Sequence, residues 1–319
     1  MPARKTRRIP EKNLRPHPPQ SAGRAARAPK LAQPVLVATD GSTVASGAVT
    51  FAKLMAERGD WAPEVVTVLE PVPVSVAELA LGAQAVTIHN GYADAVLGRI
   101  RTQLRRRGAS EWPVTVEFGS PATAIARLTR ERDVRLVVVG LGKHGKLARL
   151  MGAETAARVA RLSDVPVLAV GGDTSDLLHT AVVALDFGES SARAASEAAA
   201  LLEPTGRVHL VHVRWALNGR PVHDAATERK YAVDTEHKLA RLAEDLSHPG
   251  LVVTWELRLG GVVEEVLAAA KDVGANLIAA GSHSHGVLDR LLIGSTPSNL
   301  LRAAPCSVLV VPPVDALAR

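Results

Sequence analysis

The sequence predicts an α/β protein made of two similar domains, each with five parallel strands covered by helices on both faces. Apolar runs rich in Val, Leu and Ile alternate with segments that carry apolar residues at helical spacing, such as 121–132. Continuous apolar runs are typical of parallel strands that are buried on both faces. Landmarks of the first half also recur in the same order in the second half. Together these patterns indicate two doubly wound sheets in tandem.

The internal repeat rests on four pairs of matching segments. The pairs are 35–42 with 182–190, Gly119 with Gly260, 136–140 with 276–281, and 167–170 with 308–311. Gly119 precedes Gly140 by 21 residues, and Gly260 precedes Gly281 by the same 21. Each copy spans about 140 residues, which is a usual size for one domain. We therefore expect domains at 31–172 and 178–319, preceded by a basic tail at 1–30.

Strands and helices are predicted in alternation along each domain. The first domain should have strands at 35–39, 64–69, 114–118, 135–139 and 166–170, with helices at about 43–58, 88–107, 121–132 and 153–162. The second should have strands at 181–185, 207–213, 251–257, 276–280 and 307–311. In open parallel sheets, ligands bind beyond the carboxyl ends of strands. Asp40, Asp186 and both glycine-bearing loops follow such ends.

Composition limits the class of protein. The chain has 319 residues, of which 47% are hydrophobic, enough for two cores. None of its apolar runs approaches the ~18 residues of a membrane-spanning helix. The single cysteine, Cys306, excludes a disulfide framework and suits a reducing compartment, so we expect a cytoplasmic protein. Aromatic residues make up only 3% of the chain, which leaves few side chains on which bases could stack.

The positive charge belongs to the N-terminal tail. Residues 1–30 hold nine Lys or Arg and one Glu, whereas the formal net charge of the whole chain is +6, so the remainder sums to −2. The tail is rich in proline and lacks an apolar core segment, so we expect it to be disordered and not a secretory signal. It could make weak, salt-sensitive contacts with nucleic acid or another anionic surface. The alternative is a solubilising extension.

The segment 281–296 has the features of an anion-binding loop. It follows an apolar strand, contains glycine, and runs into Ser295-Thr296-Pro297, a typical helix start. Free backbone N–H groups and the positive end of a helix favour anions at such a place. A phosphorylated ligand is therefore the first hypothesis for the second domain.

These motifs resemble those of the universal stress proteins. The family pattern is Gly-x-x-Gly, nine residues and Gly-Ser/Thr after a strand, and Gly281, Gly294 and Ser295 match it, with Ser284 at the second glycine. Asp186 matches the acidic residue that ends the first strand. The segments 210–213 and 304–311 resemble the family's second and last strands, and the likeness extends over about residues 34–312. The resemblance implies an adenine nucleotide α-hydrolase-like fold, ATP as the ligand of some members, and last strands that pair to form an internal pseudo-dimer.

The predicted nucleotide site lies in the second domain. Its residues are Ala184, Leu185, Asp186, Val213, Gly281, Ser284, Gly294, Ser295 and Thr296. We expect Gly281 and Gly294 to use positive φ angles, which glycine adopts readily, and to let the backbone approach a phosphate. Asp186 should accept hydrogen bonds from the nucleoside, and the backbone of Val213 should border the base. The expected ligand is ATP, alone or with Mg²⁺.

A weaker second site is predicted in the first domain. Its residues are Asp40, Val68, Gly140, Gly142, Gly145 and Gly152. Ala153 replaces the hydroxyl residue, and the carboxylate of Glu154 would repel phosphates near the expected helix start.

Other classes of function fit the residues less well. The run 140–145 spells G-x-G-x-x-G, but it follows the fourth strand instead of opening the domain, which argues against a dinucleotide fold. Leu147 stands where a P-loop needs Ser or Thr. His209, His212, His283 and His285 do not form a complete ligand set, so no metal site is predicted.

Two alternatives to a nucleotide-binding stress regulator stay open. One is an interaction scaffold without a ligand. The other is a nucleotidyltransferase-like enzyme, which would need a His/Lys motif near the first strand that 39–42 and 185–188 do not provide. No nucleophile with an attached base is evident, so hydrolysis of ATP would be slow and incidental. The sequence also leaves open further assembly into a homo-oligomer.

Overall fold

The computed structural model describes residues 33–59, 61–70, 83–141, 146–171, 177–215, 225–282 and 294–313. The basic tail lies outside these residues, as do three of the predicted site residues, Gly142, Gly145 and Ser284. Below, the first half means the described residues up to 171, and the second half means those from 177 onward.

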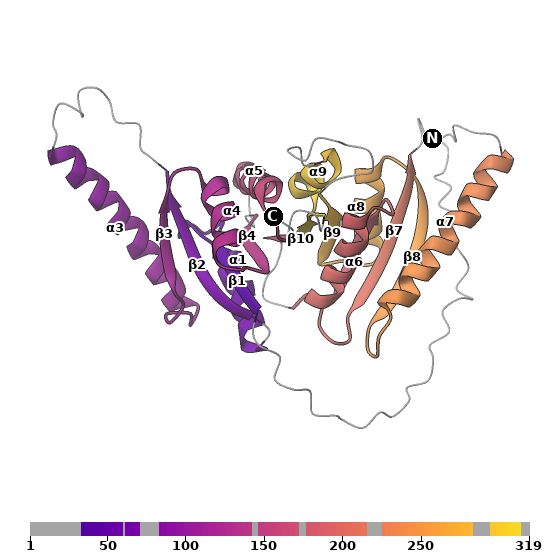
Figure 1. The fold of residues 1–319 in the computed structure, drawn as a ribbon, viewed down its shortest axis with the longest axis horizontal. Coiled ribbons are helices and arrows are strands. Elements are labelled where there is room, and N and C mark those ends of the chain that lie inside the picture. Colours follow the sequence, from indigo (N-terminus) through magenta and orange to yellow (C-terminus); the bar gives the residue numbers. More distant parts are fainter. Residues whose placement is uncertain are drawn as a thin grey trace.

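The described residues form one ten-stranded sheet in the order β3-β2-β1-β4-β5-β10-β9-β6-β7-β8. Its strands are β1 (Gln33–Ala38), β2 (Trp61–Leu69), β3 (Val114–Phe118), β4 (Leu136–Gly140), β5 (Val167–Val170), β6 (Thr180–Leu185), β7 (Arg207–Trp215), β8 (Val252–Gly260), β9 (Leu277–Gly281) and β10 (Ser307–Val311). The order within each half is the same when read from its outer edge, which confirms the predicted repeat (Figure 1). Strands within a half are parallel.

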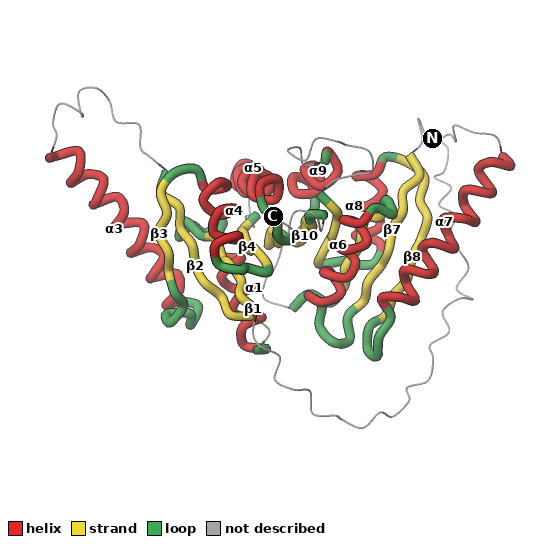
Figure 2. The backbone as a smooth tube through the Cα atoms, in the orientation of Figure 1, coloured by secondary structure: helices red, strands yellow, loops and turns green. Residues whose placement is uncertain are grey.

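Helices cover both faces of this sheet (Figure 2). They are α1 (Ser46–Glu57), α3 (Ala83–Arg106), α4 (Pro121–Glu131), α5 (Lys146–Leu162), α6 (Glu189–Leu201), α7 (Ala225–Leu246), α8 (Val262–Asp272) and α9 (Ser295–Ala303). Apolar residues of α1, α3, α6 and α7 pack in one core cluster, and those of α4, α5, α8 and α9 pack in another. The two clusters lie on opposite sides of strands whose residues alternate between them, as Leu36 and Val37 do.

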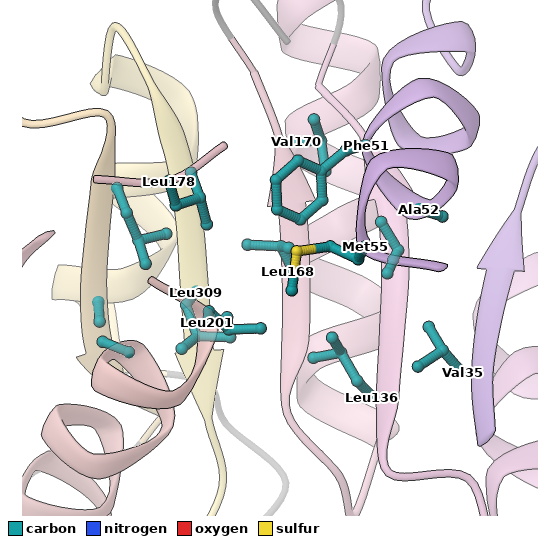
Figure 3. Close-up of a cluster of buried hydrophobic side chains, with 14 of the residues drawn as sticks. Val35, Phe51, Ala52, Met55, Leu136, Leu168, Val170, Leu178, Leu201 and Leu309 are labelled. Carbon is teal, nitrogen blue, oxygen red and sulfur yellow. The ribbon is translucent and has the colours of Figure 1, made fainter. Parts of the chain in front are cut away.

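The two halves join through their last strands, as the predicted pseudo-dimer requires. β5 and β10 pair antiparallel, with Leu168 opposite Leu309. Figure 3 shows this junction, where Leu168 lies beside Met55 of the first half and Leu309 lies beside Leu201 of the second. These side chains are almost completely buried and belong to one cluster that extends across both halves. Removal of apolar surface from water therefore stabilises the junction as it stabilises each half.

The helix after β4 differs from the prediction. We expected it to begin near Ala153, by analogy with the glycine before α9, but α5 begins at Lys146. Gly152 and Ala153 thus lie inside a helix instead of at its start. The sequence 146–152 contains residues with good helix propensity, and glycine costs only about 1 kcal/mol within a helix.

Candidate functional site

A cleft opens at the carboxyl ends of β6, β7 and β9 in the second half, with a cavity volume of about 190 Å³. It is lined by Ala184, Leu185, Asp186, Ser191, Val211, His212, Val213, Val262, Val266, Ala280, Gly281, Gly294, Ser295, Thr296 and Pro297. Every residue of the predicted second-domain site that the structure describes is among them. Strand β6 pairs with β7 on one side and with β9 on the other, so the cleft lies where the strand order reverses. Open α/β sheets bind ligands at this switch point.

Asp186 is held by the turn that follows β6. Its Oδ1 accepts hydrogen bonds from the Gly188 N–H at 2.9 Å and from Ser191 Oγ at 2.6 Å. These bonds fix the carboxylate at the mouth of the cleft. They engage only Oδ1, so Oδ2 can accept a hydrogen bond from a ligand.

The residue after Asp186 has an unusual backbone. Phe187 has a φ angle of 63°, which is uncommon for residues other than glycine. Its ring lies 4.7 Å from the His212 ring, centroid to centroid, and Lys238 Nζ lies 5.4 Å from the Phe187 ring centroid. The aromatic contact and the cation over the ring hold the turn in this conformation.

His212 is buried in the floor of the cleft. Its Nδ1 lies 2.7 Å from the Leu185 carbonyl oxygen, and its Nε2 lies 2.6 Å from the Tyr231 hydroxyl. Because the carbonyl can only accept, Nδ1 carries the proton and the neutral ring accepts from Tyr231 at Nε2. Burial lowers the pKa of His212, although the Leu185 carbonyl and nearby Asp186 act in the opposite direction. His212 is therefore neutral, and its two hydrogen bonds link β7 to the end of β6 and to Tyr231 of α7 beside the cleft.

Gly281 serves a different purpose from the one predicted. We expected positive φ angles at Gly281 and Gly294, yet neither belongs to the positive-φ glycines of the described chain, and Gly294 has φ of −55°. A Cβ on Gly281 would lie 2.4 Å from Ser190 Oγ. Glycine is needed here because α6 begins directly against the end of β9.

The start of α9 forms the opposite wall. Gly294 is its N-cap residue, and its N–H donates to the Ser282 carbonyl at 2.8 Å, while Ser298 Oγ donates to the Gly294 carbonyl at 3.1 Å. Ser295 is the first helical residue and is exposed. The first turn of a helix has backbone N–H groups without intrahelical partners, and these attract an anion.

Sequence reasoning missed part of the lining. Val262 and Val266 come from α8, and Ser191 from α6. Ser191 could have been found, because a serine five residues after Asp186 at the start of a helix can reach back to it. No local motif marks the two valines, since their approach depends on how α8 packs over β6 and β7.

The predicted first-half site has an equivalent strand-end turn. The strand registers pair Val35 with Leu136 and Ala181 with Leu277, so Asp40 corresponds to Asp186. Asp40 Oδ1 accepts from the Ser42 N–H at 2.9 Å, the same bond that Asp186 makes with Gly188. Val68, on β2, corresponds in the same way to Val213.

The rest of the first-half site is arranged differently. A Cβ on Gly152 would lie 2.9 Å from the Gly140 carbonyl oxygen, so α5 packs directly on the end of β4. Ala153 is buried. Glu154 Oε2 accepts from Arg302 Nη2 of α9 at 3.2 Å, and Oε1 accepts from Arg158 Nε at 3.3 Å. The arginines lower the pKa of Glu154, so this carboxylate is a partner of the other half instead of a group facing phosphates.

The described part of the chain lacks two kinds of feature. Among those residues, no group of three or more His, Cys, Asp or Glu side chains could hold a metal ion. The helices described there do not include one long and apolar enough to cross a membrane.

The fold defines an α/β protein with two copies of one doubly wound unit, and the second copy has a cleft at the carboxyl ends of its strands. The universal stress protein family matches residues 32–171 and again 178–312, so the chain belongs to this family in tandem form. Universal stress protein G of Shigella flexneri is 31% identical over 128 residues, covering 39% of this chain and 89% of that protein. A universal stress protein of Methanocaldococcus jannaschii is 29% identical over 84 residues, covering 26% of this chain and 52% of that protein. Membership supports a role in the stress response.

Solved structures agree on the fold. A universal stress protein from Archaeoglobus fulgidus has a TM-score of 0.59 at 19% identity and covers 89% of this chain and 98% of its own. A universal stress protein from Pseudomonas aeruginosa has a TM-score of 0.54 at 16% identity and covers 90% of this chain and 95% of its own. At these identities the likeness concerns the adenine nucleotide α-hydrolase-like fold alone.

Proposed function

We propose that this protein is a stress-response regulator that binds an adenine nucleotide, ATP foremost, in the cleft of the second half. The observation that carries the proposal is the convergence of Asp186, Gly281 and the start of α9 around one cleft at the switch point of the sheet. In the described part of the first half, α5 instead packs on the end of β4, with Gly152 against the Gly140 carbonyl oxygen. One nucleotide per chain is therefore expected.

The chemistry of the lining fits such a ligand. Val213 and Val262 border the cleft with apolar side chains suited to a base, and the fully buried Val211 and Val266 lie behind them. Asp186 can accept from ribose hydroxyls through Oδ2, as an acceptor-only carboxylate does. The N-terminal turn of α9 favours the negative phosphates, with Ser295 able to donate a hydroxyl. Magnesium would be held by the phosphates of the nucleotide, because Asp186 is the only carboxylate in the described lining.

Calorimetric titration of the full chain with ATP, ADP, AMP and cyclic AMP tests the proposal. We expect one site per chain and tighter binding as phosphates are added, because each phosphate adds negative charge at the helix start. Nucleotide analysis of the purified protein after heat release is an independent readout. If no adenine nucleotide binds and none is released, the chain is an interaction scaffold and the proposal is wrong.

A further inference from the structure

A second concave region lies in the first half, on the face of the sheet opposite to the nucleotide cleft. It is an open concavity of about 620 Å³, bordered by the turn after β1, the first turn of α1 and the C-terminal part of α3. These helices belong to the core cluster of α1, α3, α6 and α7, whereas the valines of α8 that line the nucleotide cleft belong with the other cluster. The two regions are thus separate sites, and we name this one the arginine pocket.

The arginine pocket is strongly positive. Arg99, Arg106 and Arg107 line it together with the hydroxyl residues Ser42 and Thr43, and its lining in the described chain includes no Asp or Glu. None of the ion pairs between described residues engages these three arginines. Their guanidinium groups present several N–H donors each, in a geometry that suits phosphate oxygens.

The two walls of the pocket are held together by one side chain. Gln103 Nε2 donates to the Ser42 carbonyl at 2.9 Å, and Gln103 Oε1 accepts from Thr39 Oγ1 at 2.9 Å. Close packing adds to this, because a Cβ on Gly41 would lie 3.0 Å from Arg99 Cβ. The backbone of α3 that carries Arg99 and Arg106 is therefore fixed against the turn, while the three arginine side chains are exposed to solvent.

The second half provides an internal comparison. Gly41 (φ 76°) and Phe187 (φ 63°) occupy the same place in the two strand-end turns, and Arg99 and Lys238 contact them from α3 and α7. The buried stripe Val96, Ile100 and Leu104 then corresponds to Thr235, Leu239 and Ala243. By this alignment, the counterparts of Thr43, Arg106 and Arg107 are Glu189, Asp245 and Leu246. The positive pocket is thus a property of the first half and not a by-product of the repeated fold.

We propose that the arginine pocket binds a small anion with several phosphate groups and no nucleoside, because its described lining offers no apolar side chain larger than Ala95 to a base. The volume suits a small molecule, since ligand pockets span about 300–1,000 Å³. Three guanidinium groups around one concavity favour a ligand with at least two phosphates over a singly charged one, because the attraction grows with each added charge. The site is independent of the proposed nucleotide cleft, so it can bind its ligand whether or not that cleft does.

Inorganic tripolyphosphate is the probe, titrated calorimetrically into the full chain at low and moderate salt. The test variant is Arg99→Gln/Arg106→Gln. The matched control is Arg101→Gln/Arg105→Gln, which removes the same charge from exposed arginines of the same helix that do not line the pocket. We expect the test variant to weaken binding about tenfold or more and the control to weaken it less than about twofold, because charge-assisted bonds are local. Arg106→Asp, which introduces the residue of the second half, should abolish the binding.

The outcomes separate this proposal from its rivals. Equal losses of tripolyphosphate affinity in the test and control variants would show that binding depends on the overall positive charge of α3 and not on the pocket. This result would overturn the proposal. Binding that is lost in Ser295→Ala but kept in Arg99→Gln/Arg106→Gln would place tripolyphosphate in the nucleotide cleft and also overturn it. A parallel titration with single-stranded DNA distinguishes the source of the phosphates. Binding of DNA that depends on Arg99 and Arg106, without binding of tripolyphosphate, would contradict a small-molecule site. Circular dichroism of each variant verifies that it is folded.

Discussion

Gly281, at the end of β9, lies so close to Ser190 that a Cβ atom there would approach Ser190 Oγ to 2.4 Å and the Ser190 carbonyl carbon to 2.9 Å. The first half repeats this contact, since a Cβ on Gly140 would lie 2.5 Å from the Val44 carbonyl oxygen. In both halves, the end of a central strand is packed against the region where the first helix begins. Close packing alone therefore requires glycine at both positions.

Replacement of Gly281 by alanine should destabilise the protein. The new methyl group would overlap backbone atoms of α6 that cannot move away freely, so we expect a loss of about 1–3 kcal/mol in the free energy of unfolding. Gly91→Ala is the control, because a Cβ there meets nothing within 4 Å. At this exposed position of α3, alanine should be neutral or stabilising by up to about 1 kcal/mol. Chemical denaturation of both variants measures the difference, and equal stabilities would refute the packing argument.

Loss of either Asp186 or Ser295 should weaken ATP binding. Asp186→Ala and Ser295→Ala are each expected to cost about 1–3 kcal/mol of binding free energy, as the removal of a hydrogen bond to a polar or charged group does. The matched control is Asp40→Ala, which removes the equivalent carboxylate of the first half. Calorimetry should find its ATP affinity unchanged. Wild-type affinity in both second-half variants would mean that the site has been assigned to the wrong residues.

Protonation of His212 should make stability depend on pH. Burial lowers the pKa of His212, so on acidification the unfolded chain binds a proton before the folded chain does. The free energy of unfolding should therefore fall as the pH decreases from about 7.5 to 5.5, across the ordinary pKa of histidine. Denaturation of His212→Gln should show a shallower dependence over this range. His248→Gln, at an exposed histidine, should keep the wild-type slope, and a wild-type slope in His212→Gln would exclude His212 as the cause.

Changes at Ala153 and Glu154 should not create a first-half nucleotide site. From the sequence alone, Ala153→Ser with Glu154→Thr should strengthen binding, by supplying a hydroxyl and removing a negative charge. In the structure, Ala153 is buried within α5 and Glu154 pairs with Arg302, so we expect the opposite result. The double variant should bind the same single nucleotide and unfold more easily, since it buries a hydroxyl and breaks a contact between the halves. A second equivalent of ATP in calorimetry would contradict this conclusion.

Deletion of residues 1–30 should remove any affinity for DNA, RNA or anionic lipid while leaving ATP binding intact. The tail contains the positive excess, and the remaining residues sum to −2. Binding by the full chain should also decline steeply with salt, because neutralised phosphates release counterions. Fluorescence anisotropy with labelled DNA, measured for both forms over a salt series, tests this. Equal binding by the truncated chain would direct attention to the arginines of α3.

The sequence alone determined the alternation of strands and helices, the tandem repeat and the positions of Asp186 and the loop after β9. These features are encoded locally, since apolar runs, turn residues and helix-start signals act over a few neighbouring positions. The pairing of the last strands also followed from the sequence, but only through the family resemblance.

The tertiary structure decided which distant residues meet. Val262 and Val266 reach the cleft because α8 packs over two strands, and Glu154 faces Arg302 because the β5–β10 pair brings α5 beside α9. The early start of α5 was also hidden, since Gly152 matches the glycine before a helix start in the sequence, whereas in the structure it is a close-packing position against β4. Each of these outcomes depends on the order of strands in the sheet, and local patterns contain no information about which elements become neighbours in space.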